Sequence, residues 1–182
     1  MNTLGKRIPS SSQTVGPYFR IGLDYLIDRM NDLDVTAKNT IEIRGRILDG
    51  DGVPVPDAML EFWSAENVDS IPEHGIPDRF RRVRTDLKGC YAARVKRPVA
   101  MLLEDGRLHA PHIMVLVFAR GLMRHLISRV YLEGEAANQN DTVLLNVPVE
   151  RRGTLLAEDG GENEYRWDIV LQGNDETVFF AW

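Results

Sequence analysis

The run IMVLVFA at residues 113–119 decides the fold of this 182-residue chain. It is continuously apolar over seven residues, which is typical of a strand covered on both faces and far too short to span a membrane. HLISRVYL at residues 125–132 follows across the segment ARGLMR and is predicted to be its hairpin partner. Together the two segments predict a buried β-hairpin.

Further strand patterns lie on both sides of this hairpin. In IEIRGRIL (41–48), Ile41, Ile43 and Ile47 share one face, and DGDG at 49–52 supplies a turn. Similar patterns occur at AMLEFWSA (58–65), RRVRTD (81–86), CYAARVK (90–96), YRWDIVLQG (165–173) and ETVFFAW (176–182), whereas DTVLLNV (141–147) suggests a short helix or turn. Roughly seven to nine strands and hardly any helix predict an all-β sandwich or barrel, and no long repeat indicates a solenoid.

The first forty residues have a different character. Residues 1–20 are rich in Ser, Thr, Gly and Pro, which predicts an extended arm rather than a helix. Residues 21–33 space Leu23, Leu26, Ile27 and Met30 at helical intervals, so one short amphipathic helix is expected there. The predicted organisation is an arm with a short helix at 1–40 and a β-sandwich domain at 41–182.

Composition narrows the functional classes. The chain has 22 basic and 27 acidic residues and a net charge of −5, which argues against a general nucleic-acid binder. Cys90 is the single cysteine, so a disulfide framework and a cysteine-rich metal site are excluded, and the thiol is expected to be inert and partly buried. The first twenty residues contain no apolar signal segment, so a soluble cytoplasmic protein is expected.

Four histidines are the main candidates for metal or catalytic chemistry: His74, His109, His112 and His125. His109 and His112 form HAPH, where the proline bars the helical His pair of the metalloproteases. His112 precedes the buried strand, and there a histidine satisfied by backbone is favoured over a metal ligand. The chain has no Gly-x-Ser-x-Gly elbow, P-loop or dinucleotide fingerprint, so these patterns alone leave a β-sandwich of unknown activity.

Longer stretches resemble a known family. SQTVGPYF (12–19), APHIMVLVFARG (110–121) and the closing TVFFAW are similar to the protocatechuate 3,4-dioxygenase family, a branch of the intradiol ring-cleaving dioxygenases. The resemblance continues through IEIRGRILDGDGVPVPDAMLEFWSA and LISRVYLEGE and covers almost the whole chain. It implies a mixed-strand β-sandwich with an extended N-terminal arm, built as one of two homologous chains, alpha and beta.

The resemblance also implies where iron is held. In the beta chain, two tyrosinates and two histidines bind Fe(III), and the histidines form a His-x-His pair on the strand that matches residues 112–118. This sequence has His112 but then Met114, and a thioether is a poor ligand for a hard ferric ion. Where a Tyr-Pro precedes that pair in the iron-bearing chain, this chain has Arg97, Pro98 and Val99. The five tyrosines lie elsewhere, at Tyr18, Tyr25, Tyr91, Tyr131 and Tyr165, so the chain is expected to resemble the alpha type and to bind no iron itself.

An alpha-type chain is expected to complete its partner's substrate pocket. The residues that match the family's arm are Thr14, Gly16, Pro17 and Tyr18, and Arg120 matches an arginine near the pocket. The residues alone favour an arm that only docks, and Arg120 could equally form an interchain salt bridge. Arg124 and Arg129 are expected to be solvated or at an interface.

The implied reaction inserts both atoms of O2 into protocatechuate (3,4-dihydroxybenzoate) to give 3-carboxy-cis,cis-muconate, with Fe(III) held by an obligate beta partner in a higher αβ oligomer. The alternative is a purely structural sandwich partner without a role at the site. A self-sufficient enzyme for unsubstituted catechol is disfavoured by the missing ligands. The sequence leaves two places open for four apolar side chains, the core or the interface with the partner chain. They are Trp63, Phe179, Phe180 and Trp182.

Overall fold

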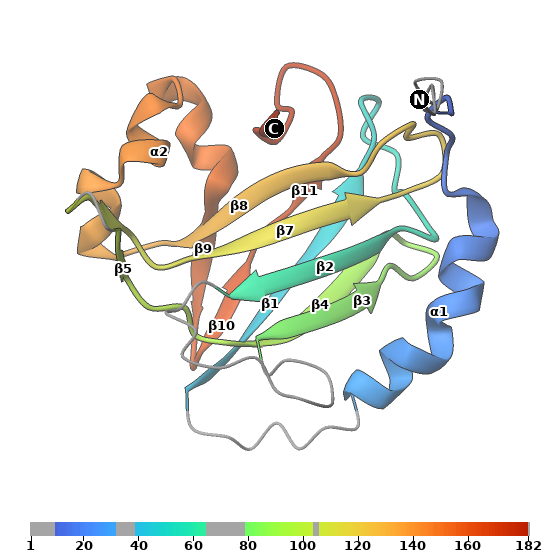
Figure 1. Cartoon of the computed structure of the whole chain (residues 1–182), viewed down its shortest axis with the longest axis horizontal. Helices are drawn as coiled ribbons and strands as arrows, with labels where there is room; N and C mark the ends of the chain where they lie inside the picture. Colours follow the sequence, from blue (N-terminus) through green and yellow to red (C-terminus); the bar gives the residue numbers. More distant parts are fainter. Residues whose placement is uncertain (1–9, 32–38, 65–78, 104–105, 182) are drawn as a thin grey trace, which may run out of the picture.

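The computed structural model describes residues 10–31, 39–64, 79–103 and 106–181, with backbone only at 17–20 and 28–31. Its strands form two packed layers (Figure 1). One layer contains β1 (Thr40–Leu48), β4 (Cys90–Lys96), β10 (Glu164–Arg166) and β11 (Ile169–Val170). The other contains β2 (Met59–Ser64), β3 (Phe80–Arg84), β7 (His112–Phe118) and β8 (Leu126–Leu132).

Strand β9 (Leu156–Gly161) connects the two layers. It pairs in parallel with β8 and antiparallel with β10. Because β1 also pairs in parallel with β10 and β11, parallel and antiparallel ladders occur in one sheet. This confirms the predicted mixed-strand β-sandwich, and a small ribbon of β5 (Met101–Leu102) and β6 (Leu108–His109) stands beside it.

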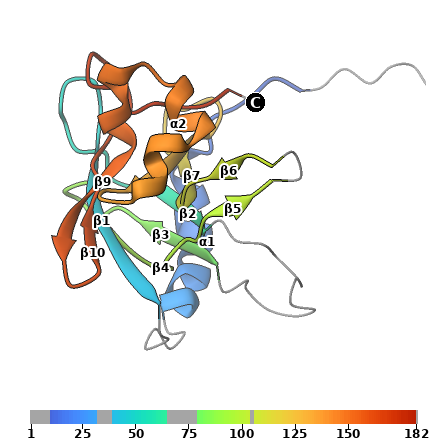
Figure 2. The ribbon, with the colours of Figure 1, turned by 90° about the vertical axis from the view of Figure 1, so that its left-hand side faces the viewer.

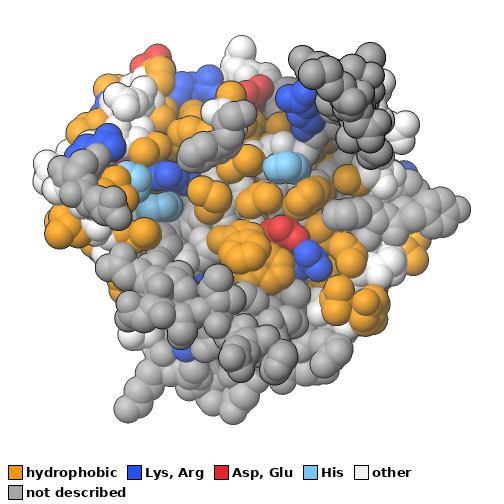
Figure 3. All heavy atoms as spheres, viewed as in Figure 1, with side chains coloured by type: hydrophobic (Ala, Val, Ile, Leu, Met, Phe, Trp, Pro, Cys, Tyr) orange, Lys and Arg blue, Asp and Glu red, His pale blue; other side chains and the backbone are white. Residues whose placement is uncertain are grey.

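The core lies between the layers and follows the alternation of the strands. Ile113, Val115 and Val117 of β7 are fully buried, whereas Met114 and Leu116 on the opposite face are only half-buried. The apolar run predicted a strand covered on both faces. That prediction is wrong for the outer face, which is only half-buried. The outer face of β2, β7 and β8 instead carries a group of apolar side chains (Figure 3).

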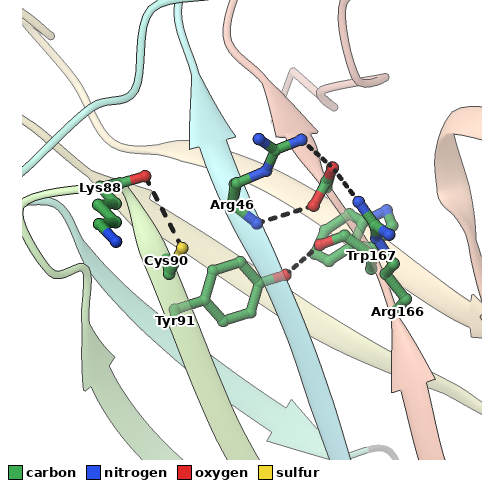
Figure 4. Close-up of polar contacts among 7 residues, drawn as sticks. Arg46, Lys88, Cys90, Tyr91, Arg166 and Trp167 are labelled. Atoms are coloured by element: carbon green, nitrogen blue, oxygen red, sulfur yellow. Dashed lines mark hydrogen bonds and ion pairs between the residues drawn. The ribbon is translucent and has the colours of Figure 1, made fainter.

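One glycine lets two strands approach closely. A Cβ at Gly45 of β1 would collide with the backbone carbonyl of Trp167, which lies between β10 and β11. The Tyr91 hydroxyl donates a 2.6 Å hydrogen bond to that carbonyl, as Figure 4 shows. Burial raises the pKa of Tyr91 well above its usual value, so the phenol stays a donor. Asp168 accepts from the backbone N–H of Arg46 and binds its guanidinium, which completes the corner.

Helix α1 (Gly16–Asn31) begins earlier than predicted. Residues 16–20 were expected to be extended, but Gly16 has a φ of 65° and Pro17 occupies the first turn, where proline needs no N–H partner. The helix packs beside β3, with an Asp24–Arg84 ion pair of 3.0 Å. None of the helices in the described ranges is long and apolar enough to cross a membrane.

A second helical segment covers one end of the β8 layer (Figure 2). It comprises η1 (Ala136–Asn140), α2 (Thr142–Asn146) and η2 (Val149–Leu155), which confirms the predicted helical segment near 141–147. Tyr131, Leu144, Val147 and Leu155 form a second apolar cluster beneath it.

The C-terminal segment is not a strand, although ETVFFAW alternates like one. Thr177 N donates to Val170 O and Phe180 N donates to Ile127 O, so the segment crosses from one layer to the other and cannot form a ladder with either. Phe179 packs against the main core and Phe180 against the second cluster, which places both partly in the core. Trp63 is 42% exposed on the outer face, and Trp182 lies outside the described residues.

Candidate functional site

The arm residue Thr14 is fixed to the turn that follows β7. Its hydroxyl oxygen accepts a 3.0 Å hydrogen bond from Gly121 N, across 107 positions of sequence. Gly121 has a φ of 88°, a backbone conformation that favours glycine. The structure therefore brings two of the predicted pocket segments together, because Gly121 is the neighbour of Arg120.

Arg120 lies at the surface of this turn. Its side chain is 53% exposed, and Nη2 lies 3.4 Å from Oδ2 of Asp57. An ion pair this long and this exposed contributes little to stability. About half of the side chain is thus open to solvent, where the guanidinium can bind an anionic group from outside the chain.

The other arm residues begin α1. Gly16 is half-buried, and a Cβ added there would meet no atom within 4 Å. Pro17 and Tyr18 follow in the helix backbone, and their side chains lie outside the described residues.

An open hollow of about 650 Å³ adjoins the arm and the turn. The arm, the β7–β8 turn and the C-terminal segment form its walls, which include Gln13, Val15, Leu122, His125, Ile127 and Phe180. The lining is mainly apolar, and Arg124 adds a positive charge at its edge. Thr14 and Arg120 are neighbours of this lining and not part of it.

His112 lies at the opposite end of β7 in a buried setting. It is 5% exposed, and its Nδ1–H donates a 2.8 Å hydrogen bond to Ala110 O in the tautomer that this contact favours. Burial, with a smaller effect from the Arg129 charge, lowers the pKa of His112 from 6.5 to about 4. A neutral histidine bonded to the backbone matches the favoured prediction for this residue.

Asp141 organises the polar groups around His112. It is fully buried and accepts hydrogen bonds of 2.8–3.0 Å from Ala110 N, Val143 N, Leu144 N and the Tyr131 hydroxyl. Burial by itself raises the pKa of Asp141, but these donors outweigh it and leave the pKa below its usual value. The carboxylate therefore caps α2 and locks β6, β8 and α2 together.

Arg129 departs from its predicted place. It was expected to be solvated or at an interface, but its exposed fraction is 7%. The register of β8 explains this, because Arg129 is mid-strand opposite Met114 and two residues before the buried Tyr131. Arg124, at the turn, is exposed as predicted.

The donors on this face are unsuited to a hard cation. A thioether at Met114 and a guanidinium at Arg129 flank the position of His112, and a fixed positive charge there repels a metal ion. The Tyr131 hydroxyl is held by Asp141, and Tyr91 and Tyr165 bind Trp167 O and Arg97 respectively. In the described part of the chain, no group of three or more His, Cys, Asp or Glu could hold a metal.

Comparison with known proteins decides the family. Residues 16–173 match a family of dioxygenases. The chain is 38% identical to the protocatechuate 3,4-dioxygenase alpha chain of Burkholderia cepacia, over 99% of each chain. The chain belongs to the intradiol dioxygenase family. Enzymes of this family depend in general on Fe(III).

Other members of the dioxygenase family are also similar. The Pseudomonas putida alpha chain is 33% identical over 93% of this chain and 94% of its own length. The Burkholderia cepacia beta chain is 27% identical over 75% of this chain and 66% of its own length. Alpha and beta homologues therefore both exist, which indicates an alpha/beta complex.

Solved structures of the family share the fold. A catechol 1,2-dioxygenase from Acinetobacter aligns with a TM-score of 0.58 at 18% identity, over 84% of this chain and 68% of that one. The dioxygenase domain of a Streptomyces fusion protein aligns with a TM-score of 0.56 at 23% identity, over 91% and 99%.

Two residues of this region were missed by sequence reasoning. Asp141 precedes the apolar TVLL segment, and an aspartate before a helix is a capping signal that could have identified it. No such local signal exists for Arg129, because its burial depends on the pairing of β7 with β8.

Proposed function

We propose that this chain is an iron-free, alpha-type subunit of a protocatechuate 3,4-dioxygenase. Its similarity to an alpha chain along its full length is the observation that carries the proposal. The assembled enzyme would convert protocatechuate and O2 to 3-carboxy-cis,cis-muconate, with Fe(III) held by a homologous beta subunit. Substrate, oxygen and iron therefore meet in the partner, and this chain contributes side chains at the rim of that pocket.

The surroundings of His112 support an iron-free role. Its partners on the outer face are a thioether and a guanidinium, and the one phenol beside it is bonded to Asp141. Met114 thus offers a thioether where the resemblance implies a histidine ligand, and the Arg129 guanidinium opposite it carries a charge that repels a metal ion. The residues do not fit Fe(III), and no step of the reaction is assigned to this face.

Thr14 and Arg120 support a role in substrate selection. The Thr14 oxygen accepts from Gly121 N, which leaves its hydroxyl hydrogen to donate to a carboxylate. Arg120, on the same turn, supplies a positive charge that is half exposed. We assign these two groups to the carboxylate of protocatechuate, with Gly16, Pro17 and Tyr18 as the neighbouring wall.

The outer face of the sheet supports a companion chain. Trp63 is 42% exposed and lies opposite the half-buried Met114, with the half-buried Leu116 two residues further along β7. Figure 3 shows apolar side chains gathered over the sheet on one face of the molecule. Apolar surface of this kind is typical of obligate interfaces. A homologous beta chain is the proposed occupant.

The test is the activity of the complex formed with a co-expressed beta chain. We expect Arg120→Ala and Thr14→Ala each to lower kcat/KM for protocatechuate, with a fall of about 10–100-fold for Arg120→Ala, the usual effect of losing a charged hydrogen bond. The value for catechol, which has no carboxylate, should change much less. Arg166→Ala, which removes an exposed arginine of β10 in the other layer, is the matched control.

If kcat/KM for protocatechuate is unchanged in both variants and size-exclusion chromatography shows an intact complex, the proposed role in substrate selection is wrong. The chain would then have a purely structural role. An equal loss for protocatechuate and catechol would contradict the carboxylate assignment while preserving a role at the pocket.

A further inference from the structure

Arg129 is a buried cation with too few acceptors. Its Nε and Nη1 atoms are inaccessible to solvent and have no hydrogen-bond partner among the described residues. Among the described residues no carboxylate forms an ion pair with it, although arginines elsewhere in the two layers pair with Asp or Glu. Burying a guanidinium without a counterion is strongly unfavourable, so this residue needs an acceptor that the described side chains do not supply.

The neighbours of Arg129 meet only part of that need. Tyr131, on the same face of β8, accepts a hydrogen bond from the guanidinium while it donates its own hydroxyl to Asp141, so it supplies an acceptor but no negative charge. Asp141 itself is saturated, since it accepts from three backbone N–H groups and from Tyr131. Met114, directly across on β7, offers only a thioether.

We propose that Arg129 binds a small monoanion, a halide or a carboxylate of the size of formate, on the outer face of β7 and β8. A monoanion supplies the missing acceptor and the missing charge in one group. It must be small, because Arg129 is only 7% exposed and its unpaired Nε and Nη1 atoms are inaccessible to solvent. This site is separate from the carboxylate contacts proposed for Arg120 and stands whether or not the chain has a role in catalysis.

The test is the thermal stability of the full-length chain at constant ionic strength, with sodium gluconate replaced stepwise by sodium chloride, bromide or formate. Gluconate is too large for the site and serves as the inert anion. At ten times Kd the apparent unfolding constant should fall about elevenfold. The matching rise in Tm is about 3–6 °C for a chain of this size and should saturate.

Arg129→Met keeps the length of the side chain and removes its charge. We expect this variant to lose the anion dependence and to be at least as stable as the wild type in gluconate, because an unpaired buried charge is gone. Arg166→Met, which removes an exposed arginine paired with Asp168, should keep the full response. Equal Tm values for the wild type in gluconate and chloride, or an unchanged response in Arg129→Met, would overturn the proposal.

Crystals of the wild type soaked in bromide give an independent answer if Arg129→Met does not fold. An anomalous peak within hydrogen-bonding distance of the Arg129 guanidinium is expected. Bromide peaks elsewhere on the molecule and none at Arg129 would also overturn the proposal.

Discussion

The role of His112 is set by the residues that surround it. Its sequence position is where the family resemblance places a metal ligand, yet its ring is buried against Ala110 O and next to a cationic residue. The sequence predicted a satisfied histidine from its place before a buried strand. It could not reveal Arg129 as a neighbour, because that contact depends on strand register.

The low pKa of His112 makes stability depend on pH. The folded pKa of about 4 lies below the unfolded value of 6.5, so the unfolded chain binds more protons between these values. The contribution is complete above pH 6.5 and is lost as the pH falls towards 4. We expect a loss of up to about 3 kcal/mol in unfolding free energy over this range from this residue alone.

Urea unfolding at pH 4, 5, 6 and 7 measures this effect. His112→Gln should remove that part of the pH dependence, whereas the exposed His125→Gln should leave it in place. Parallel pH profiles for the wild type and His112→Gln would contradict the assignment.

Asp141 is predicted to be the most sensitive polar residue of the described chain. Asp141→Ala leaves four buried or partly buried donors without an acceptor, so we expect a loss of about 3–5 kcal/mol. Because its folded pKa is depressed, the Asp141 contribution is present at neutral pH and is lost only as the pH falls below about 4.

Chemical denaturation at pH 7 tests this value. Asp159→Ala is the control, since that carboxylate is exposed and accepts only from Gly161 N. A loss for Asp141→Ala no larger than that of the control would show that α2 and β6 do not depend on the buried carboxylate.

At the scale of elements, the sequence was informative where alternation is strong. β1, β2, β7 and β8 lie within one residue of their predicted bounds at every end, because each places apolar side chains on one face. β9, with the sequence LAEDGG, has no such pattern and owes its formation to partners on β8 and β10. The predicted strand at 165–173 is split into β10 and β11 because Arg46 N of β1 donates to the Asp168 carboxylate, which interrupts the backbone ladder between them.

The close approach of β1 to the Trp167 carbonyl is possible because Gly45 has no side chain. We expect Gly45→Ala to destabilise the protein by about 3 kcal/mol or more, since its Cβ would overlap the Trp167 carbonyl and disturb the Tyr91 hydrogen bond. Gly153→Ala, where a Cβ meets nothing within 4 Å, should be neutral or slightly stabilising. Thermal unfolding of both variants distinguishes a specific clash from a general effect of replacing glycine, and equal Tm values for the two would contradict it.

At the scale of the whole molecule, the proposed function makes this chain one part of a site that its partner completes. The arm and the β7–β8 turn bring Thr14 and Arg120 to the surface, and the face around His112 carries Arg129 and Met114 instead of hard donors. Order along the sequence was enough to indicate the family and the two-chain organisation. The hydrogen bond between Thr14 and Gly121 joins residues 107 positions apart, so no local pattern predicts it.

Iron content measured chain by chain tests the central claim most directly. The full-length chain purified alone should contain no Fe(III) above background and show no oxygen uptake with protocatechuate, while its complex with a co-expressed beta chain should contain one iron per pair and consume oxygen. Stoichiometric Fe(III) in the chain purified alone, together with ring cleavage, would contradict the account.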